Sequence, residues 1–144
     1  MPVKLKLSGF EDLLTKIEKA GGSINAATQK CMKNSAAIME DELKSKMQSA
    51  DVDSRLINAM PASEIQSSGN RVTARVGYTK GVFDPKNPSD GYLAVFLNYG
   101  TPKRTKHGKV KPRGFIQKAK RSAKKKIRAE QEKTLNEILK GLSK

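Results

Sequence analysis

The chain has 144 residues, which fits one domain, and its 36% of hydrophobic residues, few aromatics and absence of Trp allow one modest core. The formal net charge is +15 at pH 7 and the pI is about 10.0. No apolar run approaches the roughly 20 residues that span a bilayer, and the first residues lack a signal peptide's apolar centre. We therefore expect the protein to stay in the cytoplasm or in an assembly formed there.

The residues that commonly carry catalysis are scarce. Cys31 is the only cysteine and His107 the only histidine, so neither a disulfide within the chain nor a zinc site is supported. No Ser or Cys near His107 has a carboxylate partner in sequence, which leaves a nucleophilic triad without support. We expect no enzyme activity, no metal and no cofactor. Cys31 shares a predicted helix face with Ala27 and Ser35, which indicates a small core residue rather than a reactive thiol.

The beginning of the chain predicts a short strand and a first helix. Apolar residues and Lys alternate over 3–7, as in a half-buried strand. Ser8 followed by Glu11 predicts a capping box, and Gly21 and Gly22 end the helix that it opens. The apolar face of this helix comprises Phe10, Leu13, Leu14 and Ile17.

A second, longer helix is predicted from about residue 23 to Gln48. Ser23 or Asn25 can cap its N-terminus. Its apolar stripe, with a period close to 3.6 residues, comprises Ile24, Ala27, Cys31, Ile38, Met39, Leu43 and Met47.

The middle of the chain predicts a short helical turn and then strands. Residues 51–60 read as a loop with one turn of helix, and 63–68 and 71–79 as two strands joined by a tight turn at Gly69–Asn70. The apolar run 92–99 suits a buried central strand, with a short helix as the alternative. The loops at 80–91 and 101–112 are polar and rich in Pro, Gly or charge, so we expect them to be the most mobile segments before assembly.

A last helix is predicted from about Phe115 to Leu139. Its apolar stripe is interrupted by the polar Gln131 and looks too thin to be fully buried within one subunit. We therefore predict an α+β fold, in which the helix at 23–48 packs across one face of a small antiparallel sheet of three to five strands. The C-terminal helix is expected to extend from the edge of this single domain, which comprises residues 1–144.

The strongest functional signal is the segment Thr101–Arg128, which contains thirteen Lys and Arg and no carboxylate. Like charges at this density repel one another unless water, salt or an anionic partner screens them. Many of them fall in the first half of the last helix, where the helix dipole disfavours cations. A solvated face is the simplest reading, but a polyanion or an acidic protein surface is the better-supported target. The residues that we expect to make this contact are Lys103, Arg104, Lys106, Lys109, Lys111, Arg113, Lys118 and Arg121.

Four segments, in their order, carry a resemblance to a known family. They are Asp53–Met60, Val76–Gly77, Asn98-Tyr99-Gly100-Thr101 and Pro112-Arg113-Gly114-Phe115-Ile116-Gln117-Lys118-Ala119. The chain resembles the small neck proteins of long-tailed bacteriophages, the tail-completion or head–tail joining proteins. Family members usually have Gly at position 54, an acidic residue at position 98 and Pro at position 114, where this chain has Ser54, Asn98 and Gly114.

The resemblance implies a virion structural protein at the head–tail interface or the tail top. Its partners would be a connector, tail terminator or tail tube. In the virion it would form a ring of identical subunits, and the isolated protein would be a monomer. DNA in the channel of the ring could also meet the basic residues, through phosphates rather than bases. The motif residues Gly77, Gly100, Thr101 and Phe115 are expected mainly to maintain the fold.

The alternative function is a non-specific nucleic-acid-binding protein, because a basic stripe and a pI near 10.0 are the usual footprint of that class. Two observations count against it. The basic segment has Phe115 as its one aromatic residue, which provides poorly for base stacking. It also matches no helix-turn-helix, zinc-finger or RRM signature.

Overall fold

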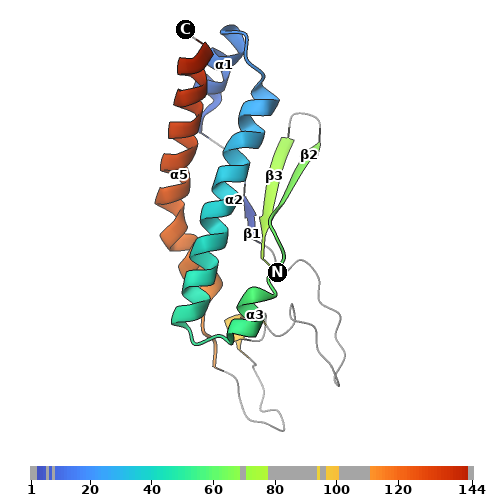
Figure 1. The fold of residues 1–144 in the computed structure, drawn as a ribbon. Coiled ribbons are helices and arrows are strands. Elements are labelled where there is room, and N and C mark those ends of the chain that lie inside the picture. Colours follow the sequence, from blue (N-terminus) through green and yellow to red (C-terminus); the bar gives the residue numbers. More distant parts are fainter. Residues whose placement is uncertain are drawn as a thin grey trace.

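The computed structural model describes residues 3–5, 7, 9–68, 71–77, 94, 97–100 and 111–142. In chain order its elements are β1 (Val3–Leu5), α1 (Glu11–Lys19), α2 (Ile24–Ser49), α3 (Ser54–Asn58), β2 (Glu64–Ser68), β3 (Arg71–Val76) and α5 (Phe115–Leu142). The α+β prediction is confirmed. A three-stranded antiparallel sheet carries α2 across one face, and α5 runs beside α2 (Figure 1).

The sheet has the strand order β1-β3-β2. Val3 lies opposite Val76 and Leu5 opposite Ala74, while Ile65 of β2 pairs with Ala74 from the other side. In β3, Val72, Ala74 and Val76 alternate with polar residues and are buried against α2. The predicted turn at 69–70 and most of the predicted mobile loops, at 80–91 and 101–110, lie outside the described residues.

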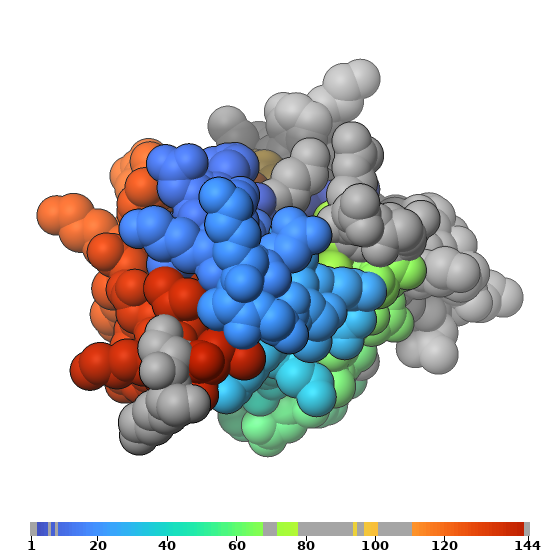
Figure 2. All heavy atoms as spheres, turned by 90° about the horizontal axis from the view of Figure 1, so that it is seen from above, coloured from blue at the N-terminus to red at the C-terminus, as the bar shows by residue number. Residues whose placement is uncertain are grey.

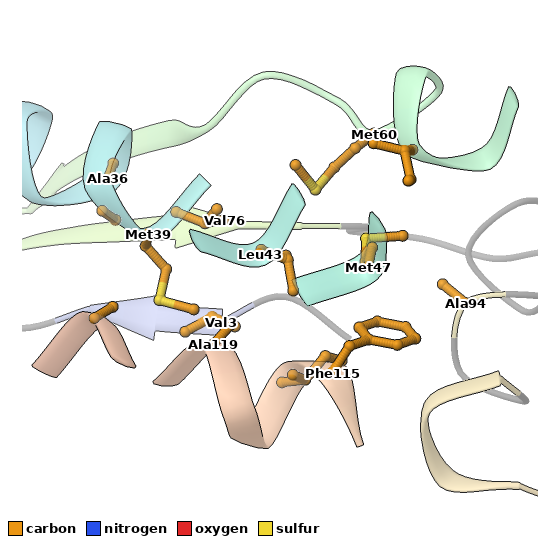
Figure 3. Packing of buried hydrophobic residues seen from close by; sticks show 14 of the residues in the cluster. Val3, Ala36, Met39, Leu43, Met47, Met60, Val76, Ala94, Phe115 and Ala119 are labelled. Carbon is orange, nitrogen blue, oxygen red and sulfur yellow. The ribbon is translucent and has the colours of Figure 1, made fainter. Parts of the chain in front are cut away.

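The main apolar core lies between α2, the sheet and the first half of α5. Met39, Leu43 and Met47 of α2 lie in one cluster with Val3 and Val76 of the sheet and with Ala119 and Phe115 of α5 (Figure 3). A second cluster packs α1 onto α2 and the end of α5. Seen along the long axis, α1 and the start of α2 lie between α5 and the sheet (Figure 2).

The helix α5 corrects one expectation. It does not extend from the edge of the domain, because its contact with α2 is the most extensive one between any two elements. Gln131, which interrupts the predicted stripe, is buried and donates from Nε2 to Ser35 Oγ at 3.1 Å. Ser35 Oγ in turn donates to the Cys31 carbonyl at 2.7 Å. Because the hydrogen bond satisfies both Gln131 and Ser35, this polar pair can be buried where the other positions of the interface are apolar.

Two further expectations fail. Ser8 lies outside the described residues, and the N-cap of α1 is Phe10, which makes no side-chain cap bond. The φ of +82° at Gly9 turns the chain away from helical geometry, so the helix begins only at Glu11. The predicted strand at 92–99 is wrong at its described positions, since Ala94 and 97–99 are helical. An apolar run alone does not distinguish a buried strand from a short buried helix.

The capping prediction for α2 is confirmed at Ser23, whose Oγ accepts from the Ala26 amide at 3.2 Å. The C-terminus of α2 forms a Schellman motif. The Val52 amide donates to the Met47 carbonyl at 3.0 Å, and Asp51, which has a φ of +57°, donates to the Gln48 carbonyl at 3.1 Å. The chain thus leaves α2 sharply and enters the short helix α3.

Candidate anion-binding surface

The exposed face of α5 displays the predicted contact residues Lys118 and Arg121 together with Lys125. These three residues are spaced by three and four positions, so they lie on one face of the helix. All three are exposed, and none of them forms a side-chain hydrogen bond or an ion pair with another described residue. This face is therefore free to meet an anionic partner.

A second set of cations lines a groove between β1 and α5. The groove has a volume of about 470 Å³, and its cationic residues are Lys4, Lys120, Lys124 and Arg128. Its apolar and neutral lining consists of Val3, Leu5, Met39, Ile127 and Gln131. None of the described residues that line it is a carboxylate.

The groove residues of α5 recur at the spacing of a single helix face, as Lys120, Lys124, Ile127 and Gln131. Around the helix, this face is turned by about 100° or more from Lys118 and Lys125. None of the groove cations was among the contact residues expected from sequence. Lys4 precedes α5 by more than a hundred residues. No local sequence pattern indicates that β1 and α5 line the same groove.

Other cations of the basic segment have partners within the domain. Lys126 forms an ion pair with Glu42 of α2. The Arg128 guanidinium lies over the Phe10 ring, 5.3 Å from its centroid, which is a cation–π geometry. These contacts hold α5 against α2 and α1.

Arg113 was expected to contact a partner, and the structure shows a contact within the fold. Its Nη1 donates to the carbonyl of Ala50 at 3.2 Å and to that of Asp51 at 3.1 Å. These carbonyls lie at the end of α2, where a cation also complements the helix dipole. Lys111, two residues earlier, is exposed, whereas Lys103, Arg104, Lys106 and Lys109 lie outside the described residues.

The two best motifs of the family resemblance meet at the start of α5. Asn98 Oδ1 accepts from the Ile116 amide at 2.9 Å, and its carbonyl accepts from the Gly114 amide at 3.0 Å. The Asn98 side chain therefore caps the N-terminus of α5. Its Nδ2 is buried and has no hydrogen-bond partner among the described residues. Phe115 next to it is almost fully buried. These contacts join the segment at 97–100 to the start of α5.

The other motif glycines occupy positions where φ is positive. Gly77 ends β3 with a φ of +111°, and Gly100 follows the helical residues 97–99 with a φ of +74°. A side chain is strained in this region, which accounts for glycine at both sites. Thr101 lies outside the described residues.

Cys31 is fully buried between α2 and α5, as expected for a core residue. Burial, helped by the nearby Glu130 and opposed by Lys30, raises the pKa of its thiol from 9.0 to about 11. Within the described residues no group of three or more His, Cys, Asp or Glu could hold a metal ion. Nor does a described helix have the length and hydropathy to cross a membrane.

No protein-family model, curated protein or solved structure that was compared with the chain matches it.

Proposed function

We propose that the chain is a structural protein of a phage virion, which acts in head–tail joining or tail completion by binding other neck or tail proteins. The observation that carries this proposal is the surface of α5. Over its first half the helix has no carboxylate, and it presents Lys118, Arg121 and Lys125 to solvent while its other side is packed in the core. An anionic partner relieves the mutual repulsion of these cations.

The motif order described above also supports this assignment. The resemblance to neck proteins rests on residues that, in this fold, shape the exits from β3 and the entry to α5. A ring of such subunits presents one basic helix face per copy, which suits binding to an acidic surface on the next ring of the neck. Protein binding is favoured over DNA because Phe115, the one aromatic of the basic segment, is buried and cannot stack on bases.

The test is deletion of the coding sequence from the genome that carries it. We expect filled heads and separate tails in electron micrographs of the lysate, and restoration of joined particles by the wild-type gene in trans. The triple variant K118E/R121E/K125E should fold, by circular dichroism, and fail to restore them.

A matched triple reversal controls for the change in net charge. Lys16, Lys19 and Lys33 are also exposed but lie on α1 and α2. K16E/K19E/K33E should therefore restore joined particles. Normal, infectious virions in the deletion strain would contradict the proposal.

A further inference from the structure

We propose that the groove between β1 and α5 binds an extended acidic segment of another protein, which adds as a fourth strand to the edge of β1 that faces α5. This inference does not depend on the assignment to a virion. It concerns a different surface from the exposed face of α5 that was discussed above.

The first argument is the position of β1. Among the described residues β1 pairs with β3 alone, so its second row of amide and carbonyl groups is unpaired there. All three residues of the strand, Val3, Lys4 and Leu5, line the groove. Because consecutive side chains of a strand point to opposite faces, a groove that meets all three runs along the strand's edge. Figure 3 shows β1 between β3 and α5, with this edge toward the helix.

The second argument is charge. Lys4 lies on one wall of the groove, and Lys120, Lys124 and Arg128 lie on the other. In the part of the chain that the structure describes, Lys4, Lys120 and Lys124 form no ion pair. A partner that places carboxylates between the walls neutralises the cations of both walls, whereas a basic partner is repelled by them.

The third argument is the apolar part of the lining. Leu5, Met39 and Ile127 give the groove an apolar floor between the cations. A strand places alternate side chains on opposite faces, so a segment in which acidic and apolar residues alternate fits both surfaces. A nucleic acid has no apolar side chain for this floor. A second copy of the chain offers few acidic segments for this groove, because its 14 Asp and Glu are outnumbered by 29 Lys and Arg.

The experiment uses the whole chain and a synthetic peptide of eight residues in which Glu and Val alternate. Two further peptides have N-methyl groups on the odd or on the even residues, which removes amide donors but keeps every charge. We expect the parent peptide to bind in a fluorescence anisotropy titration. At least one methylated peptide should bind tenfold more weakly or worse, because its donors faced β1.

Two double reversals on the same helix locate the site. K120E/K124E changes the groove wall and should weaken peptide binding at least tenfold. K118E/K125E makes the same change of charge on the face of α5 that does not line the groove and should weaken it less than threefold. Circular dichroism checks that both variants fold, as exposed substitutions should allow.

Three results would overturn the proposal. Equal losses in the two double variants would mean that charge attraction is diffuse. Unchanged binding of both methylated peptides would exclude strand pairing. Polyphosphate that binds as tightly as the peptide and displaces it would make the groove a general polyanion site.

Discussion

At the scale of single residues, Arg113 shows how one cation of the basic segment serves the fold. It precedes α5 and yet binds two carbonyls at the end of α2, joining segments that are more than sixty residues apart in sequence. A charge-assisted hydrogen bond is stronger than a neutral one, and a carbonyl that loses its donor must find water.

We therefore expect Arg113→Ala to lower the free energy of unfolding by about 1–2 kcal/mol, measured by urea denaturation. Lys111→Ala is the matched control, because this neighbouring cation is exposed and should change stability by less than about 0.5 kcal/mol. Equal effects of the two substitutions would show that the contact with α2 adds nothing to stability.

The chemistry of the Cys31 thiol depends on its burial in the fold. Its pKa of about 11 keeps the thiol neutral at pH 8, and its side chain is inaccessible. A disulfide reagent such as DTNB should leave the native protein unmodified at pH 8 and react with one thiol per chain in urea. Fast reaction of the native protein would show that α2 and α5 separate readily.

The same pKa gives a dependence of stability on pH. A pKa that is raised in the folded state adds stability below pH 9.0, and that stability is lost as the pH rises toward 11. The melting temperature should therefore fall more steeply between pH 9 and pH 11 in the wild type than in Cys31→Ala, which retains every other titrating group. Parallel curves would contradict this expectation.

At the scale of elements, the interface of α2 and α5 combines apolar contacts with a polar layer. The Gln131 amide donates to Ser35 Oγ, and Asn34 Nδ2 donates to Thr134 Oγ1 at 3.2 Å. The Ser35 hydroxyl also donates to the carbonyl of Cys31 within α2. It therefore keeps one partner when Gln131 is replaced.

Gln131→Leu should for that reason change stability by less than about 1 kcal/mol, because an apolar side chain of similar size fills the same space. Gln131→Ala should cost about 1–3 kcal/mol, since it leaves a cavity as well as removing the hydrogen bond. Both values are measurable by urea denaturation. A larger loss for Leu than for Ala would mean that the amide itself determines how the helices align.

Much of the element order follows from local signals in the sequence. The Ser23 cap of α2, Gly21 and Gly22 at the end of α1, and the apolar stripe of α5 each rest on residues that are close in sequence, so these helices were predictable. The path of α5 was not, because its burial at Gln131 depends on Ser35 across about a hundred residues. The groove escaped prediction for the same reason, since Lys4 meets Lys120 and Lys124 only through the tertiary fold.

At the scale of the whole molecule, the charge is distributed unevenly, and the net charge of +15 makes contact with nucleic acid an obvious competitor to protein binding. With Phe115 buried, such contact would depend on phosphates alone. The salt dependence of binding separates the two cases.

Duplex DNA should bind weakly, without sequence preference and with a steep loss as salt rises. K118E/R121E/K125E should lower the slope of log K against log salt by up to about 3, roughly 0.9 for each phosphate contact removed. The measurement is a titration from low to moderate salt, with K16E/K19E/K33E as the control. Sequence-specific binding that survives moderate salt would instead favour a nucleic-acid-binding protein.

The pairing of α2 with α5 also has a consequence for the time course of synthesis. Cys31 with Gln131, and Asn34 with Thr134, are contacts across 100 residues of chain. A ribosome adds roughly 5–20 residues per second, so about 5–20 s pass between the synthesis of α2 and that of α5, which covers its apolar side. Throughout that interval the nascent chain exposes a surface that chaperones bind and from which aggregation starts. The apolar side of α2 is therefore covered fully only after α5 has been synthesised.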